Sequence, residues 1–148
     1  MKNAAMDRID REIVSVLTKD GRISYRELGE QVCLSANAAA ERVKVLVSQG
    51  IIQRFSAKVD PAAVGLPLQA YVEIKLAPEA TASKFEADIQ NIPGIVGATL
   101  LTGNSDYMLR LACRDQQDFV RIMENLRVGH GVQDTQSRLV LREFDLGL

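Results

Sequence analysis

The sequence predicts an α+β protein made of two units joined by a short linker, and three observations predict it. Residues 1–58 contain helical patterns with capping residues. Residues 59–67 carry two prolines and a glycine, which is typical of a stiff linker with room for one helical turn after Asp60. Residues 68–148 alternate strand and helix patterns. With 148 residues, 47% of them apolar, the chain can bury two small cores.

The first unit begins with a helix that Asp7 can cap and that Asp20-Gly21 ends. A second helix starts at Ser24, because Ser24 with Glu27 three positions later is a capping box. The apolar positions of these two helices recur at helical spacing. They are Ile9, Ile13, Val16 and Leu17 in the first helix, and Tyr25, Leu28 and Val32 in the second.

A third helix runs from Ala36 to about Gln49, with Ser35 as its N-cap and Gly50 as the left-handed residue that ends it. Its buried stripe is Ala39, Val43 and Leu46, and its opposite face carries Asn37, Ala38, Glu41, Arg42 and Lys44.

The second and third helices, with a tight turn around Leu34 between them, form a helix-turn-helix, which commonly presents its second helix to the major groove of DNA. The alternating run at 51–58 predicts a strand beside the helices, as in the wing of a winged domain. The other possibility is a three-helix bundle whose polar face is only solvated.

The charge distribution favours DNA binding by the first unit. The net charge of −1 is unpromising for a nucleic-acid binder, but residues 1–58 hold 10 Lys and Arg against 7 Asp and Glu, whereas residues 59–148 hold 8 against 12. Such a weakly basic module binds DNA feebly as one copy, since phosphate contacts supply much of the affinity. Several copies on one assembly would gain by effective concentration, so we expect an oligomer.

The sequence lacks the motifs of an enzyme or a metal site. It has no phosphate-binding loop, no CxxC pair and one histidine, His130. Cys33 and Cys113 fall on expected core faces, which predicts reduced, buried thiols. No apolar run approaches the ~20 residues that span a bilayer, and no signal peptide is recognisable. We therefore expect a non-enzymatic, cytoplasmic protein with no cofactor and no membrane partner.

The second unit has the order β-α-β-β-α-β, a ferredoxin-like arrangement with helices on one face of an antiparallel sheet. The strands are expected at 68–76, 95–101, 106–113 and 132–144, with helices at 80–89 and from a cap at Asp115. On the last strand, Leu139 and Leu141 alternate with Val140 and Phe144. Apolar residues on both sides of the sheet predict face-to-face dimerisation.

Both halves together resemble a known family. The matching segments are IDREIVSVLTKDGRISYRELGEQVCLS at 9–35, ERVKVLVSQGII at 41–52, TGNSDYMLRL at 102–111 and GVQDTQSRLVL at 131–141. With the order of elements, they resemble the Lrp/AsnC (feast/famine) regulators over roughly residues 7–144. The resemblance implies a transcriptional regulator with a winged helix-turn-helix domain at 1–58, a linker at 59–67 and a regulatory (RAM) domain at 68–148. It also implies homodimers that commonly assemble into octamers.

The resemblance further implies which residues carry function. Duplex DNA would be contacted by Arg22, Ser35, Asn37, Ala38, Arg42, Lys44 and Arg54. An amino-acid effector, bound between C-terminal domains of neighbouring subunits, would be lined by Gly103, Asn104, Ser105, Asp106, Tyr107, Thr135 and Ser137. Asp106 can accept from the ammonium of a zwitterion, while hydroxyls and turn amides can donate to its carboxylate. From the residues alone, a plain β-turn remains the alternative.

This chain also departs from the family pattern. Ser-Ala-Asn-Ala at 35–38 stands where relatives often have proline, so base preference cannot be carried over. Val45 and Val47 stand where relatives often carry a basic and an acidic residue. An alternative function is therefore a small-molecule-binding assembly protein with little DNA affinity.

Overall fold

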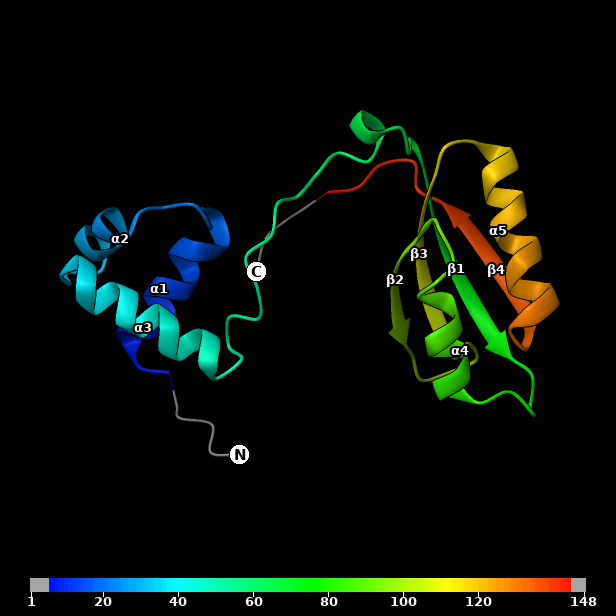
Figure 1. Ribbon diagram of the computed structural model, residues 1–148, viewed down its shortest axis with the longest axis horizontal. Helices are drawn as coiled ribbons and strands as arrows, with labels where there is room; N and C mark the ends of the chain where they lie inside the picture. The colour runs from blue at the N-terminus through cyan, green and yellow to red at the C-terminus, as the bar shows by residue number, and fades with distance from the viewer. Residues whose placement is uncertain (1–5, 145–148) are drawn as a thin grey trace. The chain divides into compact units, whose positions relative to one another are not determined.

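The computed structural model describes residues 6–144, and the chain divides into two compact units (Figure 1). The first contains the helices up to Lys58, and the second spans Val59–Glu143. Within the described residues, no helix is long and apolar enough to cross a membrane.

Three helices make the first unit: α1 (Arg8–Lys19), α2 (Tyr25–Gln31) and α3 (Ala36–Ser48). The predicted caps are confirmed. The Asp7 carboxylate accepts from the Asp10 amide at 2.8 Å, Ser24 and Glu27 form the capping box of α2, and the Ser35 hydroxyl accepts from the Ala38 amide at 3.2 Å. Each cap satisfies amide groups that the first helical turn leaves unpaired. The buried core of the unit is Ile13, Leu28, Val32, Ala39, Val43 and Leu46.

The end of α3 is fixed by a Schellman motif. Gly50 has φ of +72°, its amide donates to the Val47 carbonyl at 2.9 Å, and the Ile51 amide donates to the Leu46 carbonyl at 3.0 Å. The Ile52 amide donates to the same Leu46 carbonyl at 3.1 Å. The chain is therefore folded back against the helix immediately after it ends.

The predicted wing strand at 51–58 is wrong. This segment is irregular in the structure, and no strand of the described sheet pairs with it. Ile51 and Ile52 instead bond back to α3 and pack against the helical core. The apolar alternation that suggested a strand thus arises from packing onto helices.

Cys33 also differs from the prediction, while Cys113 confirms it. Cys33 is exposed and has φ of +57°, because the turn between α2 and α3 requires a left-handed residue there. Cys113 is fully buried in the second unit, and burial raises the pKa of its thiol.

The linker contains the expected helical turn, a 3₁₀ segment at Ala62–Val64. The Asp60 carboxylate accepts from the Ala62 amide at 3.0 Å, and Gly65, with φ of +82°, ends the turn.

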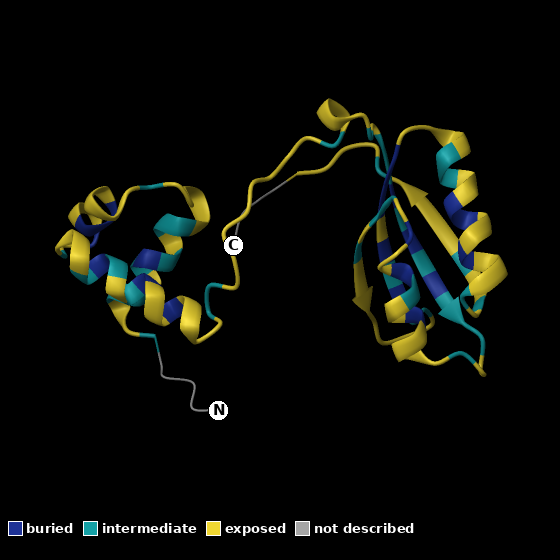
Figure 2. Cartoon of the chain, in the orientation of Figure 1, coloured by how far each residue is buried: buried dark blue, intermediate teal, exposed yellow. Residues whose placement is uncertain are grey.

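The second unit confirms the predicted order. Its elements are β1 (Leu68–Leu76), α4 (Ala82–Ile89), β2 (Ile95–Leu100), β3 (Tyr107–Cys113), α5 (Gln116–Gly129) and β4 (Val132–Leu139). The strands form one antiparallel sheet in the order β2-β3-β1-β4. Both helices lie on the same face of the sheet, and Figure 2 shows the buried residues along β1 and the inner sides of the helices. The predicted faces of Ala70, Val72 and Ile74 on β1 and of Phe85 and Ile89 on α4 are buried.

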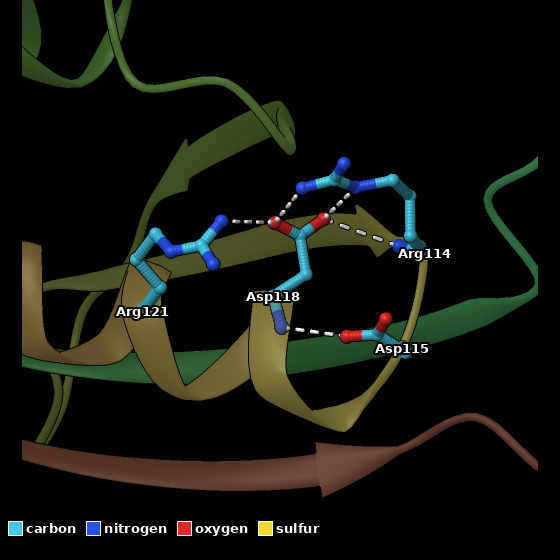
Figure 3. Close-up of polar contacts among 4 residues, drawn as sticks. All are labelled: Arg114, Asp115, Asp118 and Arg121. Carbon is cyan, nitrogen blue, oxygen red and sulfur yellow. Dashed lines mark hydrogen bonds and ion pairs between the residues drawn. The ribbon is translucent and has the colours of Figure 1, made fainter.

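The start of α5 is held by a small polar cluster (Figure 3). Asp115 caps the helix by accepting from the Asp118 amide at 2.8 Å. The Arg114 guanidinium donates to both carboxylate oxygens of Asp118, at 3.2 and 3.0 Å, and Arg121 approaches one of them at 3.4 Å. Arg114 holds the pKa of Asp118 below its ordinary value.

The last strand is shorter than predicted, ending at Leu139 and not at Phe144. Leu139 pairs with Ala70, and the Val140 amide still donates to the Gln69 carbonyl at 2.9 Å, but β1 begins at Leu68 and offers little further backbone to pair with. Strand pairing ends because the partner strand does.

Apolar residues lie on both sides of the sheet, although fewer lie on the helix-free face. That face combines polar residues, among them Glu73 with Arg138 at 2.9 Å, with Tyr71, Met108 and Ala112, whereas Leu139 lies opposite the buried Ala70 on the other face. Leu141 and Phe144 are exposed beyond the end of β4. Dimerisation through this face stays a prediction.

Candidate functional site

The exposed start of α3 is the first candidate site. Ser35 and Asn37 are exposed, and Ala38 is half-buried. Because these side chains are short, they do not block the approach of another molecule to the N-terminus of α3. Among the side chains of these three residues, the Ser35 hydroxyl makes the cap on the Ala38 amide. An exposed helix N-terminus with small residues can approach an anion closely, because its first amides point outward.

Lys44, about two helical turns further along α3, is exposed but already paired. Its ammonium lies 2.6 Å from the Glu41 carboxylate, which raises the pKa of Lys44. Both side chains are 69% exposed, so this pair is weak and can exchange partners.

Arg42 does not lie on the open face with these residues. Its Nη1 donates to Asp7 Oδ2 at 2.7 Å and to Asp10 Oδ1 at 2.8 Å, and these bonds raise the pKa of Arg42. The side chain is 34% exposed. A contact between Arg42 and DNA stays a prediction, and it would require these bonds to α1 to open.

Arg22 and Arg54 are both exposed. Arg22 lies in the loop between α1 and α2, where its amide donates to Asp20 Oδ1 at 2.9 Å. Arg54 lies in the irregular segment after α3 and lines a cleft with Leu17 and Phe55. Neither has the wing strand beside it that the sequence predicted.

The second candidate site surrounds Asp106, where the loop after β2 meets the end of β1. Asp106 Oδ2 accepts from the Leu76 amide at 2.8 Å, and Oδ1 accepts from the Lys75 ammonium at 3.1 Å. These two bonds hold the pKa of Asp106 below its ordinary value. The Asp106 amide also donates to the Ile74 carbonyl at 2.8 Å, so the residue is fixed through its backbone as well.

Tyr107 is a core residue. Its ring packs 4.9 Å from that of Phe85, and its hydroxyl donates to Glu86 at 2.6 Å. The carboxylate of Glu86 and burial raise the pKa of Tyr107 to about 12. The hydroxyl therefore stays protonated and serves to join β3 to α4.

A cleft of about 450 Å³ opens beside Asp106 and Tyr107. Its other lining residues are Lys75, Leu76, Ala77, Pro78, Ala80, Ala82, Leu100 and Gln133. Sequence reasoning missed Lys75 and Gln133, because strand register and not local sequence brings them beside Asp106.

The remaining predicted effector residues do not line this cleft. Gly103 and Asn104 are exposed in the turn, and the Ser105 hydroxyl donates to Glu73 at 3.0 Å. Thr135 accepts from Arg127 at 3.1 Å, and Ser137 lies 4.0 Å from the sulfur of Met123, both toward α5. Within residues 6–144 no group of three acidic, histidine or cysteine side chains could hold a metal ion.

Two protein-family descriptions match the chain: the AsnC-type helix-turn-helix domain at residues 6–47 and the Lrp/AsnC ligand binding domain at residues 69–146. The leucine-responsive regulatory protein of Salmonella typhimurium is 37% identical over 142 residues, covering 93% of this chain and 86% of that protein. The HTH-type transcriptional regulator AldR of Mycolicibacterium smegmatis is 36% identical over 142 residues, covering 94% and 83%.

Solved structures agree. A transcriptional regulator from Neisseria meningitidis, in complex with L-methionine, matches with a TM-score of 0.88 and 33% identity over 97% of this chain and 94% of that one. A feast or famine regulatory protein from M. tuberculosis, also complexed with L-methionine, matches with a TM-score of 0.89 and 30% identity over 95% of each chain. These relatives are regulators and not enzymes, and the chain belongs to the Lrp/AsnC family of transcriptional regulators.

Proposed function

We propose that this regulator binds duplex DNA through the exposed start of α3 and responds to a free amino acid bound beside Asp106. The observation that supports DNA binding is the N-terminus of α3, which is exposed and held in position. Its small residues leave the first amides accessible, and the Arg42 bonds to Asp7 and Asp10 hold α3 against α1. A helix held in this way can enter the major groove without rearranging.

In this proposal Asn37 reads base edges, since its amide both donates and accepts. Ser35 and Ala38 permit close approach, and Arg22, Lys44 and Arg54 contact phosphates. The two bonds of Arg42 to α1 make it an anchor of α3 first and a DNA contact second.

The effector half rests on the cleft and on the relatives. Two similar regulators were solved with L-methionine, and the cleft in this chain combines a charged pair with apolar walls. A second subunit, with Gly103, Asn104, Thr135 and Ser137 contributing across the interface, would complete the site.

We further propose that the chain works as a homodimer and assembles to an octamer in the cytoplasm, where its DNA is. The supporting argument is charge: the first unit carries only a small positive excess, so several copies must act together on one DNA.

The DNA half is tested by selecting bound duplexes from a randomised pool and measuring their affinity by fluorescence anisotropy. Asn37 is the second residue of α3, so Asn37→Asp places a negative charge where the helix dipole favours it but DNA phosphates repel it. We expect Asn37→Asp to keep the melting temperature and weaken binding at least about tenfold. Lys84→Ala on α4 is the control and should bind as the unchanged protein does. If Asn37→Asp bound DNA as tightly as the unchanged protein, the proposal that α3 contacts DNA would be wrong.

The effector half is tested by a thermal-shift screen against the common amino acids. If an amino acid raises the melting temperature but no duplex is enriched, the chain is the small-molecule-binding assembly protein of the alternative hypothesis. A screen without any response would count against the effector half.

A further inference from the structure

We propose that Glu41 of α3 reads a cytosine in the major groove of DNA by accepting a hydrogen bond from the cytosine N4 amino group. Lys44 holds the Glu41 carboxylate in position and contacts a phosphate. This assignment rests on the proposed DNA-binding function, to which it adds one base-reading residue and one base preference.

Glu41 lies on the exposed face of α3, opposite the residues that pack into the core. The buried positions of the helix are Ala39, Val43 and Leu46, whereas the Glu41 side chain is 69% exposed. Asn37, which lies four positions earlier, is exposed as well. Since an α-helix has about 3.6 residues per turn, side chains four positions apart share one face. A groove that receives Asn37 therefore receives Glu41 too.

Glu41 is also the first long side chain of α3. Alanine occupies every earlier position of the helix except that of Asn37, so the approach to Glu41 is open from the N-terminal side. Arg42, the next residue, bonds to Asp7 and Asp10 of α1 at 2.7 and 2.8 Å, which fixes the rotation of α3 about its own axis. The Glu41 carboxylate is therefore presented by a helix whose orientation is already set.

The fold gives no reason for an acidic residue at this position. Within the described residues, the Glu41 carboxylate bonds to Lys44 alone, with Oε1 2.6 Å from Nζ. Both side chains are 69% exposed, and surface ion pairs of this kind add little stability. A carboxylate on a face that contacts DNA also repels the phosphates, which weakens binding. A hydrogen bond from a base would offset that repulsion.

The chemistry of the major groove selects cytosine. A carboxylate only accepts hydrogen bonds, so it needs a donor that has no acceptor beside it. Guanine and thymine present acceptors in the major groove, and adenine presents its N6 donor next to the N7 acceptor. Cytosine presents the N4 donor without an acceptor of its own. Glu41 therefore matches cytosine and is repelled by acceptor atoms of the other three bases.

Lys44 is the positioning residue for Glu41. Its ammonium has three donors, and in the described structure Glu41 accepts from one of them. The other donors can reach a phosphate while this bond is kept. The positive charge of Lys44 also offsets the repulsion between the Glu41 carboxylate and the phosphates.

The spacing along α3 predicts where the cytosine lies. Asn37 and Glu41 are separated by about 6 Å along the helix axis, and successive bases of one DNA strand by about 3.4 Å. The cytosine should therefore lie about two base pairs from the base that Asn37 contacts.

The competing explanation is that Glu41–Lys44 is only an ion pair on a solvated helix surface. The experiment selects duplexes from a randomised pool with the full-length protein and with Glu41→Gln. Fluorescence anisotropy then measures affinity for the selected duplex with each of the four base pairs at the cytosine position. A further duplex carries N4-methylcytosine, which still pairs with guanine but lacks the N–H that points into the major groove. The matched control, Glu12→Gln, removes one negative charge from an exposed ion pair with Arg8 on α1.

For the unchanged protein, replacing the cytosine or methylating its N4 should weaken binding at least about tenfold. Glu41→Gln should move the preference from cytosine to adenine, because a side-chain amide can bond to both N6 and N7. Glu41→Ala should bind all four base pairs and the methylated duplex with similar affinity, and Glu12→Gln should keep the cytosine preference. Lys44→Met should reduce the cytosine preference, and Lys44→Arg should restore it.

A merely electrostatic role of Glu41 would raise the affinity of Glu41→Gln for every duplex equally and leave the selected sequence unchanged, and that result would overturn the inference. Equal binding of the methylated and unmethylated duplexes by the unchanged protein would overturn it as well. If Asn37→Asp weakens binding but the Glu41 variants select the same duplexes as the unchanged protein, the DNA-binding function survives and this inference fails. If no duplex is enriched at all, the DNA-binding function fails and the inference falls with it.

Discussion

Arg42 Nη1 of α3 lies 2.8 Å from Asp10 Oδ1 of α1, and the same nitrogen lies 2.7 Å from Asp7 Oδ2. Asp7 and Asp10 are also the two partners of the capping box that starts α1. The start of α1 and the position of α3, the helix that we propose to contact DNA, are therefore set by the same two carboxylates. Arg42, which the family resemblance predicts as a DNA contact, attaches α3 to α1 in this structure.

Arg42→Met should lower the melting temperature and weaken DNA binding together, because α3 loses its attachment to α1. Lys44→Met should weaken DNA binding with little change in melting temperature, since the Lys44–Glu41 pair is exposed. Thermal denaturation and anisotropy on both variants check this. Unaltered stability of Arg42→Met would show that the two ion pairs do not anchor the helix.

Gly29→Ala should destabilise the first unit by about 1–3 kcal/mol, as overpacking does. A Cβ at Gly29 would lie 2.6 Å from the Leu34 carbonyl oxygen, so the turn between α2 and α3 would have to move. Gly21→Ala is the matched control, because its Cβ would come no closer than 3.6 Å to Leu17. Urea denaturation of both variants measures the difference, and equal stabilities would contradict the close packing of the turn.

Acid should unfold the second unit partly through Asp118. Arg114 lowers the pKa of Asp118 from its ordinary value of 3.8, so the stability that this carboxylate adds is complete above that value. It is lost as the pH falls below 3.8 toward the lowered pKa. Asp118→Asn should therefore be less stable at neutral pH but lose less on acidification. Melting curves at neutral and acid pH would refute this if both proteins lost the same stability.

Alkali should reveal Tyr107. Its pKa of about 12 exceeds the ordinary 10, so the folded protein keeps a proton that the unfolded chain releases. The resulting stability is complete below pH 10 and declines as the pH rises toward 12. In a spectrophotometric titration, Tyr107→Phe should remove an ionisation near pH 12. A titration curve that keeps this component in the variant would assign it to another tyrosine.

Features with a local cause could be predicted from the sequence. The caps at Asp7, Ser24 and Ser35 depend on residues within three positions, and all are found. The alternation of apolar and polar residues predicted the bounds of β1, Leu68–Leu76, because one face of this strand is buried and the other is not. Family membership followed from the combination of such segments.

Features that depend on distant partners were missed or misplaced. The 51–58 segment alternates like a strand, but a strand exists only with a partner, and Ile51 and Ile52 bond to Leu46 instead. The end of β4 depends on where β1 begins. The Lys75–Asp106 and Arg42–Asp7 pairs join residues 31 and 35 positions apart, and no local pattern marks them.

The Leu46 carbonyl has a practical consequence for engineering this regulator. It accepts from both the Ile51 and the Ile52 amides, so the chain is still part of the first unit two residues past Gly50. Gly50 ends α3 but is the wrong position at which to insert a longer linker or a fused domain. An insertion there would separate the Ile51 and Ile52 amides from the Leu46 carbonyl and destabilise the end of α3. The first unit ends at Lys58, so an insertion belongs in the linker that follows it.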